Sequence, residues 1–149
     1  MKTEIEHLRQ TRVNLLDFFE KHESKAHVIP AGFNNNLYWN FAHCVVTQQL
    51  LCYRLSNNDV LIHESLIEKY KKGTRPSDSI PLPNEILEVK DMAIKTVDQL
   101  ELDYKEGLFN SYNAYATSYG IQLNSIEDVL SFNNIHEGLH LGYMMAIVK

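Results

Sequence analysis

Two histidines separated by four residues, His136 and His140, stand in the stretch HEGLH and could bind one metal ion. If this stretch is helical, four residues turn the chain through about 400°, so both imidazoles project from one face about 40° apart. The same five letters fit the pattern H-E-x-x-H of zinc metalloproteases, in which Glu137 would act as the general base. A chance pair of histidines on a helix is the alternative to either kind of metal site.

The protease interpretation lacks a third ligand. In metalloproteases of this kind that ligand follows the second histidine, but the sequence after His140, LGYMMAIVK, contains no histidine, aspartate, glutamate or cysteine. The third ligand must then come from upstream, and His43 is the best candidate because it lies in the middle of an apolar stretch. Facing helices in a bundle lie about 8–10 Å apart, a span that imidazoles directed at one ion can bridge. A hydrogen-bonded core histidine is the alternative for His43.

Three further residues are candidates for the surroundings of such a site. Glu137 lies about 100° from His136 around a helix, so it points either beside the metal as a catalytic base or into solvent. We expect a solvated glutamate that is not needed to hold the metal. Trp39 precedes His43 by one turn and Asn133 precedes His136 by nearly one turn, so both could line a cleft. A place in the core is equally compatible with Trp39, whereas Asn133 could orient a ligand or a water molecule.

Four segments with apolar residues at three- and four-residue steps predict the helices that would position these residues. The segments span residues 3–23, 35–55, 84–107 and 125–149. The second is apolar on more than one face, which indicates the most buried helix. The asparagines at 34–36, and the pair Ser125 and Asp128 with the spacing of a capping box, mark the starts of the second and fourth helices. The predicted fold class is therefore all-α, a four-helix bundle in a single domain over residues 1–149.

Two connections between these helices are long. About 28 residues, 56–83, separate the second helix from the third, and they include prolines, a glycine and a short segment that could be helical. Because a structureless loop of that length is unusual in a compact domain, we expect a crossover that passes along the bundle and covers part of it. The connection over residues 108–123 is rich in tyrosine, and Tyr112, Tyr115 and Tyr119 could form a lid over a pocket.

Composition and charge disfavour several classes of protein. A formal net charge of -5, with lysine and arginine scattered along the chain, gives no field that attracts nucleic acid. The first residues lack the apolar core of a signal peptide, and no apolar run reaches the roughly 18 residues of a membrane span. Cys44 and Cys52 would lie about 12 Å apart along one helix, too far for a disulfide. We therefore expect reduced thiols in a cytoplasmic protein that binds neither nucleic acid nor membrane.

The stretch NNNLYWNFAHCVVTQQLLCYRLS, residues 34–56, followed by FNNIHEGLHLGYMMAIVK, residues 132–149, resembles the DinB superfamily of metalloenzymes. The resemblance extends over nearly the whole chain. It implies a four-helix bundle in which three histidines hold a divalent metal at one end of a cleft, and the matching positions are His43, His136 and His140. Relatives commonly form dimers, and some are similar to thiol-dependent transferases or isomerases. The resemblance therefore also implies a homodimer and a small-molecule substrate, such as a thiol.

Two kinds of function fit these observations. Three imidazole ligands leave coordination positions for water or substrate, as at a catalytic zinc site. The first hypothesis is therefore a divalent-metal-dependent enzyme that activates a bound water or thiol for hydrolysis or transfer on a small molecule. Zinc is the preferred metal, and nickel or iron is compatible with three nitrogen ligands. The alternative is a non-catalytic bundle that binds a metal or small ligand, while a structural dimer with incidental histidines would bind no metal.

Overall fold

Five α-helices make up most of the chain in the computed structural model, which describes residues 1–149. They are α1 (Lys2–Lys21), α2 (Leu37–Cys52), α3 (Glu64–Tyr70), α4 (Pro83–Lys105) and α5 (Ile126–Ile147). The remaining elements are two 3-10 helices and two short strands, namely η1 (Glu23–Lys25), η2 (Arg54–Ser56), β1 (Tyr115–Ala116) and β2 (Gln122–Leu123). The helical class predicted from the sequence is confirmed.

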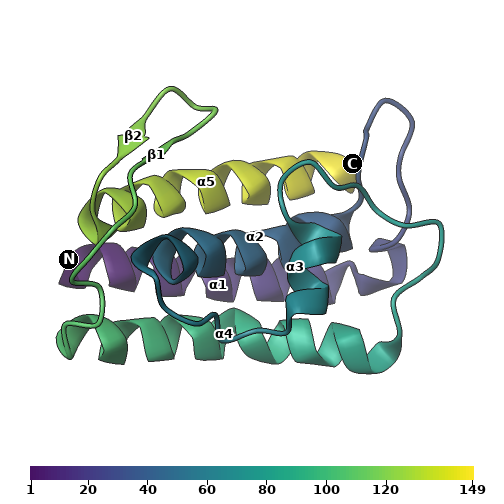
Figure 1. Ribbon diagram of the computed structural model, residues 1–149. Coiled ribbons are helices and arrows are strands. Elements are labelled where there is room, and N and C mark those ends of the chain that lie inside the picture. The colour runs from purple at the N-terminus through teal and green to yellow at the C-terminus, as the bar shows by residue number, and fades with distance from the viewer.

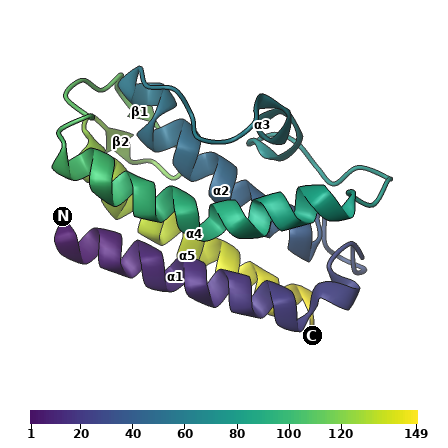
Figure 2. The ribbon, with the colours of Figure 1, turned by 90° about the horizontal axis from the view of Figure 1, so that it is seen from below.

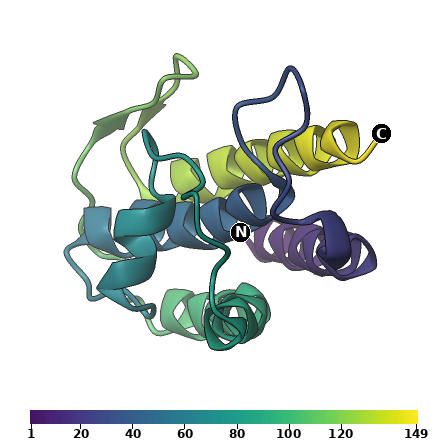
Figure 3. The same cartoon turned by 90° about the vertical axis from the view of Figure 1, so that its right-hand side faces the viewer.

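The four longest helices, α1, α2, α4 and α5, lie side by side along most of their lengths (Figure 1). Helix α1 packs against α4 and α5, and α2 packs against the same two helices. Helices α1 and α5 run in one direction and α2 and α4 in the other (Figure 2). The chain between α2 and α4 must therefore return along the helices. Helix α3 belongs to this returning segment and packs beside α2, as the view in Figure 3 shows.

Side-chain caps fix the starts of the two helices that carry the histidines. The Asn36 side chain accepts a hydrogen bond from the Trp39 amide at 2.8 Å, at the first turn of α2. The Ser125 hydroxyl accepts one from the Asp128 amide at 3.2 Å, at the first turn of α5. The Asp128 carboxylate in turn accepts from the Asn124 amide at 2.8 Å. Both predicted helix starts are confirmed, because these side chains satisfy amides that have no partner within the helix.

Helix α2 is the most enclosed element of the fold. Fourteen of its 16 residues are buried, because α1, α3, α4 and α5 all pack around it. The prediction that this helix is the most buried one is confirmed. A polar side chain on α2 is therefore removed from water and needs a partner within the protein. No helix combines the length and the apolar composition that a membrane crossing requires.

The tyrosine-rich connection before α5 contains a short hairpin that the sequence did not predict. Tyr115 pairs with Leu123 and Ala116 with Gln122 in an antiparallel register. The turn between them places Gly120 at a φ of +85°, a conformation that glycine adopts without strain. Strands of two residues are too short to show an alternating pattern, so periodicity alone could not have found them.

Candidate metal centre

The structure brings together the three histidines that the sequence proposed as ligands. His43 comes from the middle of α2, and His136 and His140 come from successive turns of α5, which packs against α2. One potential ligand atom from each lies within 4.8 Å of the others. The ring centroids are 4.5–5.2 Å apart. A cluster of three ring nitrogens at these distances could hold a metal ion.

The orientation of His43 is fixed on two sides. Its Nδ1 hydrogen-bonds at 2.6 Å to the backbone carbonyl of Tyr70, at the end of α3. Because a carbonyl only accepts, Nδ1 carries the proton, and the lone pair of Nε2 accepts a hydrogen bond from the Thr47 hydroxyl at 3.2 Å. A bound metal would take the place of that hydroxyl at Nε2. The indole of Trp39 stacks on the ring, with centroids 4.5 Å apart and planes at 12°. The Trp39 indole in turn donates to the Thr74 hydroxyl at 3.1 Å.

His140 is oriented by Asn40, one turn before His43 on α2. The His140 Nδ1 lies 2.7 Å from the Asn40 side-chain oxygen. The amide nitrogen of Asn40 donates to the Asn35 side chain and to the Asn36 carbonyl, both at 2.8 Å. These two bonds direct the Asn40 oxygen toward the histidine, so Nδ1 of His140 is the donor and Nε2 is free. Partners of this kind orient metal-binding histidines and set which nitrogen binds.

His136 differs from the other two histidines because its Nδ1 is buried without a hydrogen-bond partner. No protein group therefore fixes its tautomer, and either ring nitrogen is available as a metal ligand. Three imidazoles form a set of borderline donors suited to zinc, nickel or iron. The residues present thus fit a divalent metal of this group.

All three rings are held in the neutral form that metal binding requires. Burial, with added effects of His140, His43 and Arg12, lowers the pKa of His136 to about 2. Burial and the neighbouring His43 lower the pKa of His140 to about 3. Burial also lowers the pKa of His43, against the opposing effect of its bond to the Tyr70 carbonyl. At neutral pH the three imidazoles can therefore bind a cation without first losing a proton.

The histidines line a cavity of about 460 Å³. Its lining combines apolar side chains with hydroxyl and cationic ones. The lining residues beyond the histidines are Thr47, Leu50, Leu51, Arg54, Leu55, Lys72, Tyr115, Thr117, Ser118 and Phe132. A cavity of this size is typical of a small-molecule site.

Several residues expected around the site lie elsewhere. Trp39 is stacked behind His43 and does not line the cavity. Of the three tyrosines considered for a lid, Tyr115 lines the cavity, whereas Tyr112 donates to the Leu51 carbonyl at 3.1 Å and Tyr119 is exposed. The lid function stays a prediction for Tyr115 alone.

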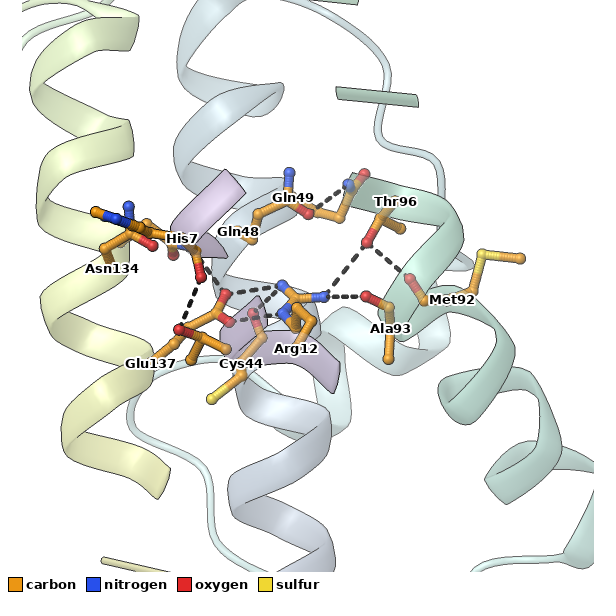
Figure 4. A network of polar contacts seen from close by, with 12 residues as sticks. His7, Arg12, Cys44, Gln48, Gln49, Met92, Ala93, Thr96, Asn134 and Glu137 are labelled. Carbon is orange, nitrogen blue, oxygen red and sulfur yellow. Dashed lines mark hydrogen bonds and ion pairs between the residues drawn. The ribbon is translucent and has the colours of Figure 1, made fainter. Parts of the chain in front are cut away.

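Glu137 is fully buried, so the expectation of a solvated glutamate is wrong. Its carboxylate accepts hydrogen bonds from Arg12 Nε at 2.7 Å and Arg12 Nη2 at 2.9 Å (Figure 4). The Asn133 amide donates to it at 2.8 Å. Asn133 is fully buried in this network and does not line the cavity. The 100° between Glu137 and His136 places the glutamate on the side of α5 that faces α1, where it meets a buried cation.

Arg12 joins the four long helices through one guanidinium group. Besides Glu137 on α5, it donates from Nη2 to the Cys44 carbonyl on α2 at 3.1 Å. Its Nη1 donates to the Ala93 carbonyl on α4 at 2.9 Å and approaches the Thr96 hydroxyl at 3.4 Å (Figure 4). Cys44 follows His43 in sequence and Glu137 follows His136, so this Arg12 network fixes the backbone beside two of the three candidate ligands.

Sequence reasoning missed Arg12, although a signal was present. The inward stripe of the first helix runs through Ile5, Leu8, Leu15 and Phe19, all of them buried. Arg12 occupies the step of that stripe where an apolar residue is expected. A charged residue at a core position implies a buried counter-ion, since an unpaired buried charge is too costly. Glu137, the only charged residue between Val129 and Val148, was the available partner.

The chain is a mostly helical protein with a candidate metal centre, in which histidines from two helices meet beside a cavity. The family model described as the DinB superfamily matches residues 7–144. The chain therefore belongs to the DinB superfamily. None of the curated protein sequences compared with the chain matches it.

Proposed function

We propose that the chain is a divalent-metal-dependent enzyme that uses His43, His136 and His140 to activate a water molecule or a thiol for hydrolysis or transfer on a small molecule. The observation that carries this proposal is the meeting of three neutral imidazoles, with one ligand atom of each within 4.8 Å, on the wall of a cavity. When bound, the metal would lower the pKa of a coordinated water or thiol. Zinc is our preference, and nickel or iron fits the same donors.

The chain's own groups position the ligands. The Tyr70 carbonyl and the Asn40 side chain bind Nδ1 of His43 and of His140, which directs Nε2 of both rings toward the candidate metal position. We assign no proton transfer to Glu137, because its oxygens accept from Arg12 and Asn133 in a fully buried network. We infer that Glu137 acts as a positioning residue.

The metal content of the purified protein tests this proposal. Wild-type protein should retain about one divalent ion per chain after dialysis, and His43→Ala should lose it. His63→Ala is the matched control, because the His63 side chain is 79% exposed and outside the cavity. Wild-type protein without metal, or His43→Ala with full occupancy, would contradict the proposal. Bound metal without turnover of any hydrolysable ester or small thiol would favour the alternative, a bundle that only binds a metal or ligand.

The proposed function also implies a fold and a cellular compartment. We propose that α1, α2, α4 and α5 form the four-helix bundle of the superfamily and that residues 53–82 form its crossover. The opposite directions of α1 and α2 and the return of the chain before α4 support this arrangement. We place the protein in the cytoplasm, because both cysteines are free and buried, as is usual where thiols stay reduced.

We also propose a homodimer, supported by the outward face of α5. Ile135, Leu139 and Met145 are exposed there, and the only charged residue between Val129 and Val148 is the buried Glu137. Two copies could therefore meet along α5 without bringing like charges together. Sedimentation of wild-type protein as a monomer at micromolar concentration would refute this state, and Leu139→Glu should dissociate the dimer.

A further inference from the structure

The cavity beside the histidines is lined by two cationic side chains and by no carboxylate. Arg54 and Lys72 contribute to its wall, whereas none of the chain's 19 aspartate and glutamate residues does so. The chain as a whole carries a formal net charge of -5. The charged side chains that line the cavity are therefore opposite in sign to the net charge of the chain. A cleft lined by one sign of charge raises the local concentration of ligands of the other sign.

Lys72 has no partner within the protein. Its ammonium group forms no ion pair and no hydrogen bond, whereas the neighbouring Lys71 is held by both Glu68 oxygens at 2.8 and 2.9 Å. Lys72 is exposed and follows the end of α3. The carbonyl that orients His43 belongs to Tyr70, two residues earlier. Residues 70–72 therefore supply both the carbonyl that orients His43 and an unpaired ammonium group that lines the same cavity.

Arg54 uses only part of its guanidinium group. Its Nη2 donates to the two Glu64 oxygens at 3.2 and 2.8 Å, and both side chains are exposed. The Nε and Nη1 groups of Arg54 make no hydrogen bond. Exposed ion pairs of this kind contribute at most about 1 kcal/mol, so Arg54 can also bind an anion in the cavity through its remaining donors.

The rest of the wall suits a small organic molecule. Leu50, Leu51 and Phe132 form an apolar surface, and the hydroxyl groups of Thr47 and Ser118 add neutral polar contacts. A volume of about 460 Å³ accommodates a small ligand. An apolar body with one charged end would match both the apolar and the cationic side chains of this lining.

We propose that the site takes a small organic anion, whose charged end binds Lys72 and Arg54 while its reactive sulfur or oxygen lies at the three histidines. This inference rests on the proposed function, since it assigns the reactive end to the candidate metal. It adds the substrate class, an amphipathic anion, and it assigns specificity to Lys72 and Arg54.

The test compares two thiols that share a three-carbon chain and differ in their end group, which is an anionic sulfonate in one and a neutral hydroxyl in the other. Protein loaded with cobalt(II) is titrated with 3-mercapto-1-propanesulfonate and with 3-mercapto-1-propanol, and binding is followed by the absorption of the cobalt–thiolate bond. Sulfonate is a poor metal ligand, so a preference for it reports on the protein. At low ionic strength we expect the sulfonate to bind about 3- to 10-fold more tightly than the alcohol. The preference should shrink as added salt screens the charges.

Matched variants locate the source of the preference. Lys72→Met should abolish most of it and Lys72→Glu should reverse it, whereas Lys71→Met, with the same change of charge one residue away, should retain it. Equal affinities for the two thiols in wild-type protein, or equal preferences in Lys72→Met and Lys71→Met, would overturn the inference and leave the proposed function standing. Failure of both thiols to alter the cobalt spectrum would exclude activation of a thiol, the half of the proposed function on which this test depends, and would overturn this inference with it.

Discussion

Replacing Arg12 with methionine is expected to destabilise the fold strongly. The Arg12 side chain is fully buried and supplies the only cation paired with the buried Glu137 carboxylate. The Arg12→Met substitution leaves that carboxylate with one hydrogen-bond donor, the Asn133 amide. Removing one partner of a buried ion pair costs about 3–5 kcal/mol of the free energy of unfolding. For a chain of this size, the melting temperature should fall by about 6–20 °C.

The assay is urea denaturation of metal-free protein, followed by circular dichroism at 222 nm and a fixed neutral pH. Arg9→Met is the matched control, because it makes the same change of charge one turn earlier on α1. Arg9 pairs with Asp98 and Glu101 at the surface, where all three side chains are partly exposed. An ion pair of this kind contributes at most about 1 kcal/mol, so Arg9→Met should stay close to wild type.

A double substitution separates the effect of the charge from that of side-chain volume. Arg12→Met combined with Glu137→Met replaces the buried pair by two apolar groups, which is often neutral or stabilising. The double variant should therefore recover most of the stability that Arg12→Met loses. The reasoning is refuted if Arg12→Met loses no more than Arg9→Met, or if the double variant is no more stable than the single one.

Two further predictions concern the histidines. Asn40→Ala should weaken metal binding by about 10- to 100-fold, measured by competition with a chromogenic chelator, while the exposed Asn14→Ala should not change it. In metal-free protein, burial holds the pKa of His136 at about 2 and, with His43, that of His140 at about 3, against about 6.5 in an unfolded chain. The unfolded state therefore binds more protons than the folded state as the pH falls below about 6.5. Each histidine should lower the free energy of unfolding by roughly 1.36 kcal/mol per pH unit, so the slope for both should approach about 2.7 kcal/mol per pH unit. A His136→Gln/His140→Gln variant should show a much flatter dependence between pH 6.5 and 5, and an equal slope would contradict the assignment.

The helices and the pair on α5 could be predicted because both depend on local spacing. Apolar periodicity marks a helix wherever one face is buried, and a separation of four residues places His136 and His140 on one face whatever surrounds them. The Asn36 and Ser125 caps are likewise local, because each contacts an amide three residues later. His43 required more than spacing, since its place opposite α5 depends on how two helices pack.

The contacts that orient the ligands could not be predicted in the same way. The partner of His43 is the Tyr70 backbone carbonyl, and every residue type carries one, so the sequence holds no signal for it. Burial of Glu137 depends on which helix covers that side of α5. Periodicity indicates that a helix has an inward face, but it does not identify the neighbour. The unexpected charge at Arg12 was the one sequence feature that could have linked α1 to α5.

The Arg12 network couples the stability of the fold to the geometry of the candidate metal centre. The guanidinium bonds to the Cys44 carbonyl, next to His43, and to the Glu137 carboxylate, next to His136. Loss of Arg12 should therefore weaken metal binding as well as folding. A metal that binds only the folded state stabilises it by about 2.7 kcal/mol at 100 times its dissociation constant. That stabilisation is comparable to the free energy of unfolding that Arg12→Met loses. Bound metal should therefore offset much of the loss if the ligands keep their spacing, and less of it if they do not. The experiment compares the gain in free energy of unfolding that saturating zinc gives to Arg12→Met, to wild type and to Arg9→Met. A smaller gain in Arg12→Met than in the other two measures how far the spacing of His43 and His136 depends on the buried ion pair.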